Sequence, residues 1–253
     1  MLDLRLISAE ALKLRRRHGM LAIAVLLTLG LVLLVFAVTG IQHSGNPAKY
    51  GPAGGEASYR DGLTVLALMA LVVGVIVGGT AGTQDIESGV FRDLAATGRS
   101  RRALFGARVT GAWAIVLPIL AVAMAAMGGL SIALAGSLPA PTGATLVAGT
   151  AAILVAGALS SAMAVGLSAL VGSRGPVIGI LLAFFLAIQP LLAAIGFLGA
   201  ARQGIPSLVI DRIGHMPGQP GVQLALGTAI AAAIGWVAVT LGLGAWKTTA
   251  REI

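Results

Sequence analysis

Cysteine is absent from the sequence, and both aromatic and charged residues are scarce. Without cysteine the chain can have no disulfide, no thiolate nucleophile and no thiolate metal ligand. Aromatic residues make up 4% of the chain, and the basic residues form no stripe with aromatic platforms, which argues against nucleic-acid binding despite a formal charge of +8. Only 10% of residues are charged, 57% are hydrophobic and the mean hydropathy is +0.97. This balance excludes a soluble domain and predicts a protein whose main solvent is lipid.

Six long apolar runs contain no Asp, Glu, Lys or Arg. A hydrocarbon core of about 30 Å is crossed by about 20 helical residues at about 1.5 Å each. The sequence therefore predicts an all-α, polytopic membrane protein with one transmembrane domain over residues 1–253. In the fifth run, Gln189 and Pro190 predict a kinked or partly re-entrant helix. The six predicted spans are residues 20–41, 62–83, 109–136, 143–171, 176–200 and 221–246.

Basic residues are distributed unevenly between the two sides of these spans. With both termini in the cytoplasm, 13 Lys and Arg residues lie in cytoplasmic segments and 4 lie in outer loops. Because cytoplasmic loops carry the excess of Lys and Arg, we expect a multi-pass protein with both termini inside. Arg far outnumbers Lys, and Ala and Gly abound, as is typical of a GC-rich prokaryote. We therefore expect the prokaryotic plasma membrane.

The predicted spans also lack the groups that catalysis or ion coupling requires. Protons and ions cross membranes on Asp, Glu, His or Lys side chains at membrane depth, and the six runs contain none. His18, His43 and His215 lie at a membrane boundary or in loops, so no metal site is predicted. Phosphate-binding, serine-hydrolase and zinc-protease motifs are missing. We expect no enzyme and no cofactor on this chain, so energy for uphill movement would come from another chain.

The first organised cytoplasmic segment is residues 1–18. Apolar residues at helical spacing and a cluster of basic residues near its end predict an amphipathic helix on the inner membrane surface. Such a helix either anchors the chain to anionic lipid or contacts a partner protein, and the sequence leaves both open. The residues that define it are Leu4, Ile7, Lys13, Leu14 and Arg15.

The second organised segment lies between the second and third spans. Asp85 and Glu87 suit the first turn of a helix, and Gly98 suits the residue after its end, which predicts a short helix over residues 85–97. Ser100 is predicted to cap a further helix that leads into the third span. The short helix either docks into a groove on a soluble partner or rests on the membrane. Its apolar stripe consists of Ile86, Val90 and Leu94.

Glycines recur at four-residue spacing in two of the spans. They are Gly74, Gly78 and Gly82 in the second span and Gly175 and Gly179 in the fifth. Small residues let helix backbones approach closely within lipid. They predict either packing between spans of one chain or a dimer interface on the second or fifth span.

Together these features resemble the permease subunit of type-2 ABC transporters. In that family the loop after the second span carries an acidic residue, a Gly and a basic residue, and later a Thr-Pro-x-Ser-Arg run that leads toward a further basic residue. Gly98 and Arg99 depart from the usual Pro and apolar residue. The resemblance covers the whole chain in architecture and about 25 residues in motif. The matching residues are Glu87, Gly89, Arg92, Thr97, Ser100, Arg101 and Arg108.

The resemblance implies the permease of an ATP-driven exporter, which forms the pathway as a dimer with itself or a sister permease. Two copies of a separate ATP-binding cassette ATPase subunit would bind ATP and Mg and grip residues 85–97 as a coupling helix. The N-terminal helix would brace that joint, and the second and fifth spans would line the pathway. The implied ATPase contacts are Asp85, Ile86, Glu87, Val90, Phe91, Arg92 and Leu94, and the implied pathway residues are Met69, Phe184, Phe185 and Gln189.

Spans without ionisable groups favour a small hydrophobic or amphipathic substrate, such as a drug, an antibiotic or a lipid-like compound. Two other functions fit the sequence. An ATP-independent secondary carrier would need a buried ion-binding carboxylate, which the spans lack. A non-transport scaffold or sensor subunit would bind a soluble partner through the same loop without turnover.

Overall fold

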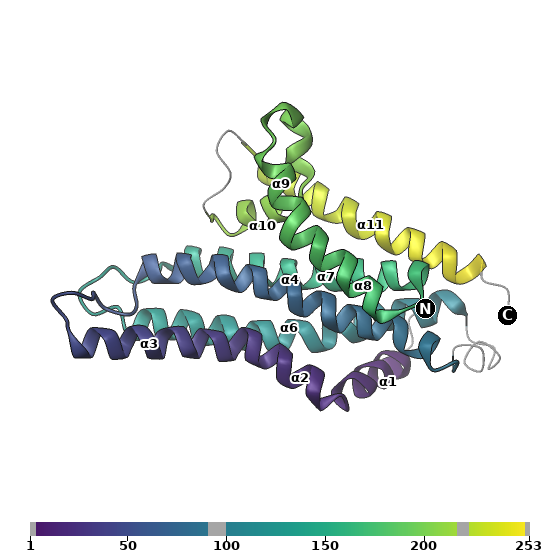
Figure 1. Ribbon diagram of the computed structural model, residues 1–253, viewed down its shortest axis with the longest axis horizontal. Coiled ribbons are helices and arrows are strands. Elements are labelled where there is room, and N and C mark those ends of the chain that lie inside the picture. Colours follow the sequence, from purple (N-terminus) through teal and green to yellow (C-terminus); the bar gives the residue numbers. More distant parts are fainter. Residues whose placement is uncertain (1–3, 91–99, 217–222, 251–253) are drawn as a thin grey trace.

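The computed structural model describes residues 4–90, 100–216 and 223–250, and within them the chain is helical with no strand (Figure 1). Six helices are long and apolar enough to cross a membrane, which confirms the all-α, six-span prediction. They are His18–Gly45, Glu56–Glu87, Arg101–Ala133, Gly143–Val171, Arg174–Ala194 and Leu226–Ala250.

The elements follow one another in a simple order. Helix α1 (Leu4–Arg15) precedes the first span, which consists of α2 (His18–Val25), a π-helical turn (Leu26–Gly30) and α3 (Leu31–Gly45). The second to fourth spans are single helices: α4 (Glu56–Glu87), α6 (Arg101–Ala133) and α7 (Gly143–Val171). The remaining elements are α8 (Arg174–Ala183), a π-helical turn (Phe184–Ile188), α9 (Gln189–Ala194), a 3₁₀ segment (Gly196–Gly204), α10 (Pro206–Ile213) and α11 (Leu226–Ala250).

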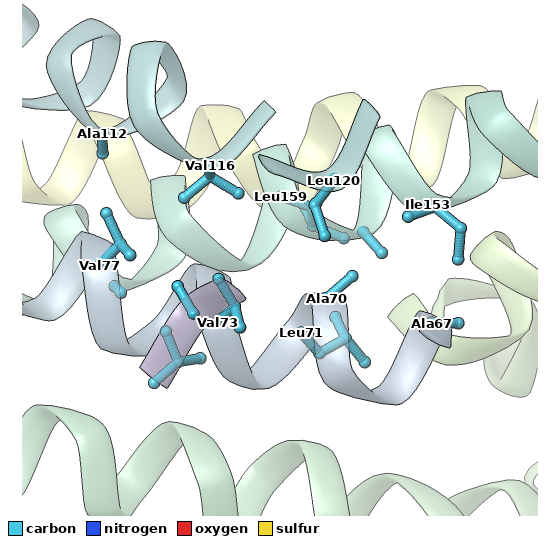
Figure 2. Packing of buried hydrophobic residues seen from close by; sticks show 14 of the residues in the cluster. Ala67, Ala70, Leu71, Val73, Val77, Ala112, Val116, Leu120, Ile153 and Leu159 are labelled. Carbon is cyan, nitrogen blue, oxygen red and sulfur yellow. The ribbon is translucent and has the colours of Figure 1, made fainter. Parts of the chain in front are cut away.

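Helices α4, α6 and α7 form the centre of the molecule. Of the most apolar stretch of each span, 72% is buried in α7 and 61% in α4, but only 6% in α11. Figure 2 shows Val73 and Val77 of α4 directed toward α6 and α7, where Val116 and Leu159 lie. The first, fifth and sixth spans therefore pack on the outside of this core and present most of their apolar surface to lipid.

Local sequence signals set several helix ends. The Ser100 side chain accepts a hydrogen bond from the backbone N–H of Ala103 at 3.2 Å, which confirms the predicted cap of the helix leading into the third span. Thr142 caps α7 in the same way through the backbone N–H of Thr145. Gly172 ends α7 at a φ of +81°, a left-handed conformation that glycine adopts without strain.

The fifth span is interrupted close to the predicted position. Pro190 has no backbone N–H, and its ring crowds the preceding turn, so the helix widens into the π-helical turn Phe184–Ile188 just before it. There the backbone N–H of Gln189 donates to the carbonyl of Phe184, five residues back. The span ends at Ala194, six residues short of the predicted end at Ala200.

The glycines of the second span pack inside the chain. A methyl group on Gly78 would lie 2.8 Å from the Cα of Ser161 in α7, and one on Gly74 would lie 2.8 Å from the carbonyl oxygen of Gly157. In the fifth span, by contrast, Gly175 and Gly179 have no other residue within 4 Å of the same position. The four-residue spacing in α4 therefore serves close contact with α7 within one chain.

Candidate functional site

A buried cluster of charged residues joins α1, α4 and α6 at the end of the bundle where α1 lies (Figure 1). The Asp85 carboxylate, near the end of α4, accepts from Lys13 Nζ at 3.0 Å and from Arg108 Nη2 at 3.2 Å. Lys13 Nζ also donates to Glu10 Oε1 at 2.7 Å. These four residues, the junction cluster, fasten the N-terminal helix to the second and third spans.

The packing of α1 against the bundle sets the position of the junction cluster. Leu14 of α1 is 1% exposed and belongs to the main hydrophobic core. One turn earlier, Glu10 lies against Gly111 of α6, where a methyl group would approach Glu10 Cβ to 2.7 Å. Because Gly111 has no side chain, α1 can lie close to α6. This close contact brings the Glu10 and Lys13 side chains to the end of α4.

The charges of the junction cluster reinforce one another. Burial lowers the pKa of Lys13, but the hydrogen bonds and negative charges of Glu10 and Asp85 outweigh it and raise the pKa above 10.5. Lys13 is therefore a stable cation. The Asp85 carboxylate is held between two positive charges, those of Lys13 and Arg108. Arg108 is only 2% exposed.

The predicted start of the coupling helix at Asp85 is wrong. Asp85 and Glu87 form the last turn of α4, which runs without a break from Glu56. The acidic residues that suggested a first helical turn are stabilised instead by partners on other elements. The helix ends at Glu87 with Ser88 as its C-cap, and Gly89 follows with a φ of +74°, as is typical of the residue after a helix C-terminus.

The residues expected to contact an ATPase divide into three groups. Asp85 is 5% exposed and paired within the chain, so its carboxylate is not offered to a partner. Glu87 and Val90 are exposed, and Ile86 is half-buried. Glu87 Oε1 also accepts from the backbone N–H of Arg174 at 2.6 Å, which joins the end of α4 to the start of α8. Phe91, Arg92 and Leu94 lie outside the described residues.

Helix α1 packs on the bundle with the predicted apolar face, except at its N-terminal end. Leu14 lies in the core, but Leu4, at the other end of the predicted stripe, is 78% exposed. Ile7 and Lys13 are half-buried, and Arg15 is exposed. The face in contact with the bundle can carry Glu10 and Lys13 because Lys13 pairs with both the Glu10 and the Asp85 carboxylates. Sequence reasoning missed Glu10, whose i,i+3 spacing to Lys13 was the one local signal.

Two of the four predicted pathway residues are buried inside the chain. Phe185 is 3% exposed, and Gln189 is fully buried with its Oε1 accepting from the backbone N–H of Ser207 at 2.9 Å. Phe184 is half-buried against Trp236 of α11, with ring centroids 5.6 Å apart, and Met69 is half-buried on α4. Gln189 therefore fastens α10 to the fifth span.

Helix α10 carries a carboxylate in an unfavourable environment. Burial raises the pKa of Asp211 from 3.8 to about 6. Because ionisation is harder in the folded state, stability falls as the pH rises from 3.8 to about 6 and is then constant. We expect Asp211→Asn to raise stability by about 2 kcal/mol near neutral pH, with the gain shrinking as the pH is lowered through this window.

Thermal unfolding of the purified chain as a function of pH measures this effect. The same substitution at the exposed Asp61 controls for the loss of one negative charge. A gain from Asp211→Asn that persists unchanged down to pH 3.8 would contradict the account.

The molecule is thus a helical membrane protein with six spans, and its N-terminal helix is fastened to the end of the second span. Within the residues that the structure describes, no group of three or more His, Asp or Glu side chains could hold a metal ion. A family model described as "ABC-2 family transporter protein" matches residues 6–190, from α1 into α9. Because the match covers well over half of the chain, the protein belongs to the ABC-2 transporter family and is a permease-type membrane subunit. A search of curated proteins finds no match.

Proposed function

We propose that this chain is the membrane subunit of an ATP-driven exporter and works as a dimer with two copies of a separate ATPase subunit, which bind ATP and Mg. The observation that carries the proposal is the family match from the N-terminal helix to the fifth span. A permease of this family implies a partner ATPase in general. The substrate class that best fits spans without ionisable groups is a small hydrophobic or amphipathic compound.

The segment that begins at the end of α4 is the proposed site of ATPase contact. The junction cluster holds the last turn of α4 to α1 and α6, so a force applied just beyond Glu87 would be passed to three elements at once. Ile86, Glu87 and Val90 stay in the proposal as contacts, together with Phe91, Arg92 and Leu94. Asp85 acts from within by fixing the position of this turn.

Replacing Glu87 with alanine tests this contact. We expect insertion to be normal and the substrate-linked ATP hydrolysis of the reconstituted complex to fall by about tenfold, because a charge-assisted contact is lost. Glu56→Ala is the matched control, since Glu56 is the first residue of the same helix and lies at its other end. ATP hydrolysis that is equal in the two variants would remove Glu87 from the coupling contact.

We propose that both termini lie in the cytoplasm. Single cysteines test this directly, because the chain has no cysteine of its own. In intact cells, Ala57→Cys at the exposed start of α4 is expected to react with a membrane-impermeant maleimide, and Ser88→Cys at its end is expected to be protected. Labelling at Ser88→Cys with protection at Ala57→Cys would reverse the orientation.

The dimer is proposed to form through the fifth span. Its glycines Gly175 and Gly179 face open space, whereas those of the second span are covered by α7. Backbones of two copies can approach closely where such small residues are exposed to lipid.

A further inference from the structure

A cavity of about 340 Å³ lies where the first, second and fifth spans meet, at the same end of the bundle as α1. Its volume is at the lower end of the range for small-ligand sites. One wall is apolar, and Ile23 on that wall is 49% exposed on the outside of the bundle, so the cavity is reached from the side that faces lipid. The lining residues are Arg17, Gly19, Met20, Ile23, Ile76, Thr80 and Arg174.

The polar part of this cavity is positively charged. Arg17 and Arg174 both line it, and no acidic side chain does. Arg17 donates through Nε to the neutral amide of Gln84 at 3.2 Å, which leaves its terminal nitrogens available for a ligand. The interaction between Arg174 and Glu87 runs through the backbone N–H of Arg174, so the guanidinium is not used in it.

Two helices also begin at the cavity. Arg17 immediately precedes α2, and Arg174 is the first residue of α8. The helix dipole favours an anion near the start of α2, whereas the first backbone N–H of α8 already donates to the Glu87 carboxylate. The two guanidinium groups therefore supply most of the positive charge that a phosphate would meet. The cavity thus combines an anion-binding end with an apolar wall that is open to lipid.

We propose that this cavity binds the phosphate of an anionic phospholipid, with an acyl chain lying along Met20 and Ile23. A phospholipid would use both parts of the cavity, since its phosphate would bind the two arginines and its acyl chain would contact the apolar wall. A free phosphate would contact only the arginines. Because Arg17 and Arg174 also contact Gln84 and Glu87 in the last turns of α4, the bound lipid joins the first and fifth spans to the turn that precedes the proposed coupling segment. The site does not depend on the proposed transport function.

Lipid titration of the purified full-length chain in detergent tests the proposal. Dioleoylphosphatidylglycerol is expected to raise the unfolding temperature with a saturable dependence, and native mass spectrometry is expected to detect a bound lipid. Dioleoylphosphatidylcholine is expected to have at least tenfold weaker affinity. Arg17→Gln and Arg174→Gln should each weaken phosphatidylglycerol binding by about tenfold, the loss expected for one charge-assisted contact.

Arg102→Gln is the matched control, because Arg102 is exposed at the start of α6 and does not line the cavity. If Arg17→Gln disturbs folding through loss of the Gln84 contact, Arg174→Gln carries the test, since its backbone bond to Glu87 is retained. Equal affinity for the two lipids, or equal losses in Arg102→Gln and Arg174→Gln, would overturn the site. Inorganic phosphate that reproduces the full stabilisation at similar concentration would show that phosphate, and not lipid, is the ligand.

Discussion

Asp85→Ala is expected to destabilise the protein by about 3 to 5 kcal/mol, because it breaks the ion pair between Asp85 and the buried Arg108 guanidinium. Lys13 keeps its ion pair with Glu10, at 2.7 Å, so the main cost falls on Arg108 and on the joint between α4 and α6. The midpoint of thermal or denaturant unfolding in detergent measures the effect, together with the amount of protein in the membrane.

The matched control for this change is Asp61→Ala, which removes an exposed acidic residue from the same helix. We expect it to change stability by less than about 0.5 kcal/mol. A double variant, Asp85→Leu with Arg108→Leu, should lose less stability than the sum of the two single leucine variants, because both members of one buried ion pair are removed together. Additive losses, or equal effects of Asp85→Ala and Asp61→Ala, would contradict the assignment of the junction cluster as a coupled buried network.

The second large effect is expected at Gly78. A β-carbon there would meet the backbone of Ser161 on α7, and backbone atoms cannot move aside as the end of a side chain can. Gly78→Ala is expected to cost about 3 kcal/mol by forcing α4 and α7 apart, and Gly78→Leu is expected to prevent stable folding.

Gly179→Ala on the fifth span is the matched control, because nothing lies within 4 Å of the added methyl group. Unfolding of the single chain in detergent should be almost unchanged by it. If Gly78→Ala were as well tolerated as Gly179→Ala, α4 and α7 could not be in the close contact described here.

The number and position of the spans could be predicted because each depends on one strong local quantity, the length of an apolar run. The ends of the helices were harder to predict, because a helix can continue through charged residues when those residues have ion-pair partners. Helix α4 begins at Glu56, six residues before the predicted start at Gly62, where Glu56 pairs with Arg60 within the helix at 2.6 Å. It also ends at Glu87, beyond the predicted Thr83.

The junction cluster could not be predicted because its members are far apart in the sequence. Asp85 is 72 residues from Lys13 and 23 from Arg108, and no periodicity relates them. Asp85 alone therefore looked like a helix start, whereas in the fold its charge is neutralised from two other helices. Ser100, by contrast, caps its helix through the backbone N–H of Ala103, only three residues away, and this local signal was interpreted correctly.

The fifth span shows the same division between local and distant causes. Pro190 acts on its own turn, so the interruption was foreseen, although the π-helical form of the turn was not. The burial of Gln189 depends on α10 folding back so that the Ser207 N–H reaches its side chain, a contact 18 residues away that no local pattern indicates. No feature of the sequence therefore indicated that the Gln189 Oε1 atom has a partner within its own chain.

We propose that this permease works with a separate ATPase that engages the segment following α4. Affinity purification of the tagged chain from its native membrane in mild detergent tests it most directly, with identification of the co-purifying proteins and assay of ATP hydrolysis. We expect a stoichiometric ATP-binding cassette subunit, which is lost when residues 88–97 are replaced by a Gly/Ser linker but retained when residues 46–55 at the opposite end of the bundle are replaced. A chain that purifies folded but alone, with no associated ATP hydrolysis, would show that this segment does not bind an ATPase.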